Sequence, residues 1–97
     1  MKPSVALQAH RDKIRLVVER HGACNPRVFG SVLHGVDDET SDLDLLVDPI
    51  EGKTTLLSLV RIKREIESLT GISTDVLTPL SLHERFRQVV LAEAKPI

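Results

Sequence analysis

Apolar residues recur along most of the chain at helical spacing, and glycines interrupt the pattern. This spacing predicts a first helix over 4–21, which ends at Gly22. A second helix is predicted over 53–70, with Gly71 just past its end. A last helix opens at Ser81, three residues before a glutamate, which is the spacing of a capping box. We expect the buried face of this last helix to comprise Leu82, Phe86, Val89 and Val90.

Three shorter apolar runs between these helices have the pattern of β-strands. The predicted strands are 27–29, 43–47 and 72–78. The Asn25-Pro26 dipeptide is expected to form a turn before the first strand, and 32–34 a short helix after it. The element order αβαβαβα indicates a single α/β (α+β) domain over 1–97.

Composition narrows the class of protein. With 41% hydrophobic and 28% charged residues, the chain of 97 residues has the composition of a globular domain. A net charge of −1 argues against nucleic acid as a direct partner. No apolar run approaches the roughly 20 residues that span a bilayer, and no apolar leader is evident, so we expect no membrane contact and a cytoplasmic location. Cys24 stands alone, which excludes an internal disulfide and favours a small, half-buried thiol.

Acidic residues are concentrated in one part of the chain. From Ser31 to Gly52 there is no Lys or Arg, whereas six basic residues precede this segment and seven follow it. Such a segment is usually a solvated loop, but two of its acids interrupt an apolar strand pattern. The segment holds seven of the 14 acidic residues: Asp37, Asp38, Glu39, Asp42, Asp44, Asp48 and Glu51.

The two acids in the strand pattern are Asp42 and Asp44. Strand alternation sends both to one face, about 6–7 Å apart at their Cα atoms. Their mutual repulsion is relieved if a cation lies between them, and Mg²⁺ prefers oxygen ligands of this kind. For an isolated pair, the ordinary alternative is that Asp42 caps the loop and Asp44 faces solvent.

Gly30 and Ser31 lie at a predicted strand-to-helix junction. Glycine lets a backbone approach phosphate closely, and the N–H groups that open the next helix attract anions. The Ser31 hydroxyl adds one more donor. Alone, the pair is equally well explained as a common turn with a serine N-cap.

Asp75 is a third acid within a strand pattern, and it shares a face with Ser73 and Leu77. If its strand pairs beside Asp42 and Asp44, three carboxylates converge. The alternative is a polar residue on the solvent face of an edge strand, and the pattern leaves both open.

Taken together, Gly30-Ser31, ten further residues, Asp42-x-Asp44 and a later strand acid resemble the motif of the polymerase-β-like nucleotidyltransferase superfamily. The flanking residues 27–29 and 41–48 are similar as well. The match is nearest to the minimal nucleotidyltransferases, whose length of roughly a hundred residues fits the whole chain. This resemblance implies a small nucleotidyltransferase fold, in which helices flank a mixed central sheet of three to four strands.

The resemblance also implies roles for five residues. Asp42, Asp44 and Asp75 would be catalytic carboxylates that hold two Mg²⁺ ions, while Gly30 and Ser31 would hold the β- and γ-phosphates of ATP. The implied activity is transfer of AMP to a hydroxyl, commonly that of tyrosine, on a HEPN-domain ribonuclease toxin. The chain would then be the antitoxin of a toxin–antitoxin pair and part of a hetero-oligomer.

One stretch departs from the family pattern. Many members carry arginines soon after the Gly-Ser pair, where this chain has Val32, Leu33 and His34. Triphosphate binding would therefore be weaker or depend on Arg27 or Lys53. His34 is either a phosphate contact or an inert surface histidine.

Two other functions remain as alternatives. One is a catalytically weak or inactive antitoxin that neutralises its toxin by binding alone. The other is nucleotidylation of a small molecule with a separate substrate-binding subunit. The apolar run 89–91 in the last helix fits either contact with a partner or packing onto the chain's own sheet.

Overall fold

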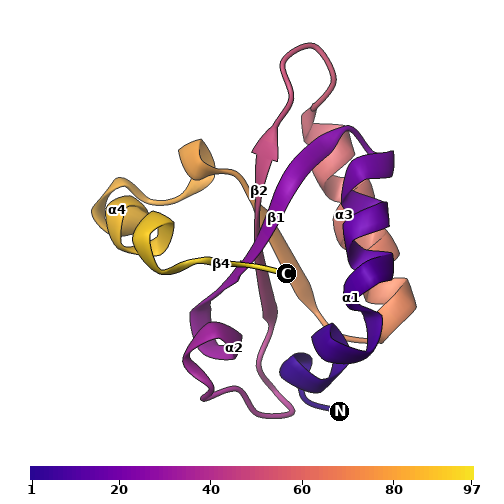
Figure 1. Cartoon of the computed structure of the whole chain (residues 1–97), viewed down its shortest axis with the longest axis vertical. Coiled ribbons are helices and arrows are strands. Elements are labelled where there is room, and N and C mark those ends of the chain that lie inside the picture. Colours follow the sequence, from indigo (N-terminus) through magenta and orange to yellow (C-terminus); the bar gives the residue numbers. More distant parts are fainter.

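The computed structural model describes residues 1–97 as a mixed four-stranded sheet flanked by helices (Figure 1). Helices α1 and α3 pack side by side on one face of the sheet, and α4 lies on the other side. The elements are α1 (Pro3–Arg20), β1 (Ala23–Phe29), α2 (Gly30–His34), β2 (Leu43–Pro49), α3 (Leu56–Thr70), β3 (Thr74–Leu77), the 3-10 turn η1 (Pro79–Ser81), α4 (Glu84–Glu93) and β4 (Lys95–Pro96).

The strand order is β3-β2-β1-β4. Strands β2 and β3 are parallel and are joined through α3, whereas β1 is antiparallel to both β2 and β4. The mixed sheet of three to four strands implied by the resemblance is therefore confirmed. Because β1 runs directly into α2, the first residues of α2 lie beside the start of β2 (Figure 1).

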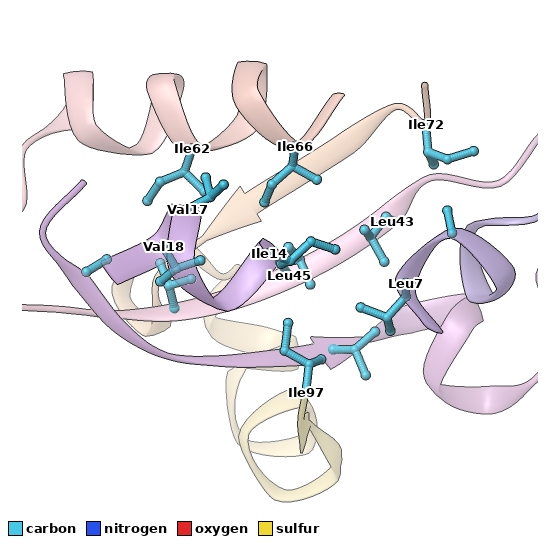
Figure 2. Close-up of a cluster of buried hydrophobic side chains, with 14 residues drawn as sticks. Leu7, Ile14, Val17, Val18, Leu43, Leu45, Ile62, Ile66, Ile72 and Ile97 are labelled. Carbon is cyan, nitrogen blue, oxygen red and sulfur yellow. The ribbon is translucent and has the colours of Figure 1, made fainter. Parts of the chain in front are cut away.

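The core fills the space between the sheet and the α1–α3 pair. Figure 2 shows Ile62 and Ile66 of α3 facing Ile14 of α1 and Leu45 of β2. Ile97 reaches the same cluster from the segment after β4. Each fully buried aliphatic side chain of this size contributes roughly 1.5–3 kcal/mol, so this layer holds the sheet in place.

Strand β1 is longer than the predicted 27–29, and the expected turn at Asn25-Pro26 is wrong. The dipeptide lies inside the strand, where the pairing register with β2 shifts between Cys24 and Arg27. Asn25 takes a φ of +50°, a left-handed conformation that asparagine tolerates better than most residues. The Asn-Pro dipeptide that predicted a turn instead marks a β-bulge within β1.

The helix starts also differ from prediction. Helix α3 begins at Leu56 rather than at 53, because Thr55 and Ser58 form a capping box there. The capping box predicted to open at Ser81 is wrong. The Ser81 hydroxyl accepts the Thr78 N–H at 2.8 Å within η1, and α4 begins only at Glu84.

The predicted buried face of α4 is only partly correct. Leu82 is buried but precedes the helix, whereas Phe86 and Val89 are 57% and 55% exposed. The helix instead turns Arg87 inward, where its guanidinium donates to the carbonyls of Pro79, Leu80 and Leu82. Strand β4, which is defined by its pairing with β1, was not predicted. None of the helices combines the length and apolar character that crossing a bilayer requires.

Candidate active site

Strands β2 and β3 present acidic residues on the sheet face opposite α1 and α3. Leu43 and Leu45 belong to the core, so alternation directs Asp44 to the other face. On β3, Thr74 is fully buried and Val76 packs against the core, which directs Asp75 the same way. Asp44 and Asp75 are direct partners in the parallel register. The structure thus brings together two carboxylates on strands that lie about 4.8 Å apart.

The charge state of Asp44 reflects this crowding. Partial burial raises the pKa of the Asp44 carboxyl to about 6, and the neighbouring charges of Asp75 and Asp42 contribute in the same direction. Asp75 and Asp42 are themselves exposed. A divalent cation would relieve this repulsion and lower the pKa of the Asp44 carboxyl.

These oxygen donors suit Mg²⁺, but no three acidic, His or Cys side chains form a complete metal site. Mg²⁺ rarely requires one, because it binds through one or two carboxylates and completes its shell with water and substrate phosphates. Asp42 and Asp44 would supply the protein ligands. These residues therefore suit a Mg²⁺ ion that binds together with a phosphate group.

Gly30 lies directly against Asp44. Phe29, the last residue of β1, is the register partner of Asp44, and the chain then turns at Gly30 with a φ of +73°. A Cβ at Gly30 would collide with the Asp44 Oδ2 atom. No side chain caps the N-terminus of α2, which leaves the N–H groups around Ser31 available to a ligand. The backbone turn and the carboxylate therefore share one small region.

Comparison with known proteins agrees with this geometry. A profile of the nucleotidyltransferase domain matches residues 12–97. A candidate protein adenylyltransferase of Methanocaldococcus jannaschii is 43% identical over 84% of this chain and 87% of its own length. The chain belongs to the minimal nucleotidyltransferase family.

Further similarity comes from one more relative and from solved structures. The protein adenylyltransferase MntA of Thermococcus cleftensis is 36% identical over 90% of this chain and 84% of its own length. A solved candidate minimal nucleotidyltransferase is 43% identical, with a TM-score of 0.85 over 100% of this chain and 97% of that one. The fold also matches a chain of a toxin–antitoxin crystal structure with AMP-PNP, at 18% identity and a TM-score of 0.73 over 88% of this chain and 69% of that one.

Three elements border the acidic face of this nucleotidyltransferase: η1, α4 and α2. Leu46 lies on that face between Asp44 and Asp48, yet it is fully buried. The 3-10 turn η1 contacts β2. Helix α4 follows η1, and α2 lies at the other end of this face, beside the start of β2 (Figure 1). His34 links α2 to α4, since its Nε2 atom is 3.1 Å from Glu93 Oε2 at the end of α4. In this arrangement the His34 side chain contacts α4.

The structure does not bring the suggested substitutes for the missing arginines to Ser31. Asp44 is near the start of β2, and the end of that strand is about 17 Å away along the strand. Lys53 lies beyond that end. The Arg27 guanidinium forms an ion pair with Asp48 and also donates to the Asn25 carbonyl. Neither side chain is therefore placed to substitute for the missing arginines.

Sequence reasoning missed two residues of this site. Phe29 is half-buried on the acidic face, next to Asp44, and only its alternation with the buried Val28 signals this. Glu93 had no local signal, since it lies 59 positions from His34.

Proposed function

We propose that the chain is a protein adenylyltransferase that acts as an antitoxin, transferring AMP from ATP to a tyrosine of a HEPN-domain ribonuclease toxin. The contact of the Gly30 backbone with the Asp44 carboxylate carries this proposal. A phosphate-binding turn and a metal-binding carboxylate would then share one site, where Asp42 and Asp75 add charge. A triphosphate with Mg²⁺ is a ligand whose anionic phosphates match the turn and whose cation matches the carboxylates.

The reaction is a substitution at phosphorus. The acceptor hydroxyl oxygen attacks the α-phosphorus, the bond from that phosphorus to the bridging β-oxygen breaks, and pyrophosphate leaves. The hydroxyl proton passes to the Asp75 carboxylate, which is exposed and beside Asp44. Two Mg²⁺ ions would neutralise charge on the phosphates. Asp42 and Asp44 would hold the ions, and Gly30 and Ser31 would orient the β- and γ-phosphates.

The acceptor tyrosine must come from another molecule, because this chain contains no tyrosine. Two features of similar proteins support a protein acceptor. The relatives from Methanocaldococcus jannaschii and Thermococcus cleftensis carry the name protein adenylyltransferase. The matched complex with AMP-PNP is a toxin–antitoxin pair. A cytoplasmic hetero-oligomer with the toxin follows from this proposal.

Neutralisation by binding alone is the second candidate. It is favoured by the missing arginines after Ser31 and by the exposed apolar side chains of α4, which suit a stable complex. The crowding at Asp44 favours the enzyme, since a pure binding surface gains nothing from carboxylates that repel one another.

One experiment separates the two candidates. The chain is incubated with α-labelled ATP, Mg²⁺ and the protein encoded by the adjacent open reading frame. The enzyme proposal expects label on that protein with the wild-type chain and none with Asp42→Asn/Asp44→Asn, while both versions bind it. An unlabelled partner that is nevertheless bound and inhibited would favour occlusion.

A further inference from the structure

Helix α4 carries an apolar surface that nothing in the chain covers. Phe86 and Val89 are 57% and 55% exposed, and the His83 ring lies against Phe86 with centroids 5.8 Å apart. Phe86 is one of only two aromatic residues in the chain. We call His83, Phe86 and Val89 the α4 face. Adjacent exposed apolar side chains that include an aromatic are typical of protein-binding surfaces.

The α4 face leads toward the nucleotide site. Phe86, Val89 and Glu93 recur at the helical spacing i, i+3 and i+7, so they share one stripe about 10 Å long. Glu93 at its end contacts His34 of α2, and α2 begins at Gly30. A molecule bound along this stripe would therefore reach the rim of the phosphate-binding turn. The helix lies on the same side of the sheet as Asp44 and Asp75.

Charge at the site indicates what kind of molecule fits. Asp75 and Asp42 are both exposed, and the 31–52 segment that contains Asp42 has no Lys or Arg. An acidic surface would be repelled here, whereas one with Lys or Arg beside its acceptor hydroxyl would be attracted. A small acceptor would not need the α4 face, and a tyrosine acceptor cannot come from this chain.

We propose that the α4 face docks the acceptor protein of adenylyl transfer, through an apolar surface on that protein flanked by Lys or Arg. This inference rests on the proposed function for the nature of the partner. It assigns α4 the role of binding the acceptor, while Gly30, Ser31 and the carboxylates handle the nucleotide. Docking on α4 positions the acceptor hydroxyl over the site.

A matched pair of double variants tests the docking surface. Phe86→Lys/Val89→Lys removes the apolar contact and adds charge that repels a basic partner. Leu56→Lys/Leu57→Lys makes the same change at residues 78% and 55% exposed on α3, on the opposite face of the sheet. The probe is the purified protein encoded by the adjacent open reading frame. Its Kd is measured by calorimetry, and transfer is followed with α-labelled ATP.

We expect Phe86→Lys/Val89→Lys to weaken the Kd at least about tenfold, as for interface hot spots. The KM for the acceptor should rise in parallel, with ATP affinity and melting temperature unchanged. The α3 variant should bind and label the partner like the wild type. This split between acceptor KM and ATP affinity separates docking from damage to the site.

Three results would overturn the proposal. They are unchanged affinity in the α4 variant, equal losses in both variants, and no complex with the wild-type chain. Failure of the proposed function looks different: the wild-type chain binds the partner and leaves it unlabelled. In that case the Kd comparison still decides whether the α4 face docks it.

Discussion

Among single residues, Gly30 combines a φ of +73° with a position against the Asp44 carboxylate. Gly35 at the other end of α2 has a φ of +69°, but a Cβ added there would meet no atom within 4 Å. We expect Gly30→Ala and Gly35→Ala each to lower stability by about 1 kcal/mol through backbone strain. Only Gly30→Ala should also abolish nucleotide transfer, because its Cβ displaces Asp44.

Urea unfolding and the labelling assay measure these two effects separately. Equal activity in the two glycine variants would show that the contact between Gly30 and Asp44 is unimportant for the site.

Asp44 gives the protein a predictable pH dependence when no metal is bound. Its pKa is about 6 in the fold, above the ordinary value of 3.8, so the folded state holds this proton more tightly than the unfolded chain. The resulting stabilisation is present below the ordinary pKa and is lost as the pH rises through about 6. Asp44→Asn should therefore melt at a higher temperature than the wild type above about pH 7, with the difference shrinking toward about pH 4.

Asp38→Asn is the matched control for this melting series. Hydrogen bonds from Thr40 lower the pKa of Asp38, so its ionised form stabilises the fold and its loss should act in the opposite direction at neutral pH. If Asp44→Asn melts below the wild type at neutral pH without Mg²⁺, the crowding of carboxylates is not destabilising.

At the scale of elements, the contact between His34 and Glu93 joins α2 to α4. Both side chains are about half exposed, so the pair is worth at most about 1 kcal/mol. We expect His34→Gln and Glu93→Gln to have the same small effect, namely faster hydrogen exchange in α4 with unchanged ATP affinity. Weaker ATP binding in His34→Gln alone would instead identify His34 as a phosphate contact.

Which elements could be predicted depended on how they are stabilised. The α1, α3 and β2 patterns were visible because their apolar periodicity reflects burial in one core. Strand β4 has two residues and exists only through pairing with β1, which leaves no local signal. The side of α4 that faces the protein is the one carrying Arg87, which donates to carbonyls of η1 and of the residue after it. Periodicity does not contain these hydrogen bonds, so it assigned Phe86 to the core.

For the molecule as a whole, spacing identified the acids and the Gly-Ser turn, but the fold supplies their proximity. Pairing of Asp44 with Asp75 requires β3 to lie parallel beside β2, and the contact with Gly30 requires β1 on the other side. Neither pairing can be read from spacing along the chain. The burial of Leu46, on the strand that η1 contacts, likewise depends on tertiary structure.

The most direct test of adenylyl transfer is intact and tandem mass spectrometry of the partner protein after co-expression. With the wild-type chain, the account predicts a partner that carries AMP on tyrosine. With Asp42→Asn/Asp44→Asn, the partner should be bound but unmodified. A wild-type complex in which the partner is inhibited and carries no AMP would contradict the central claim.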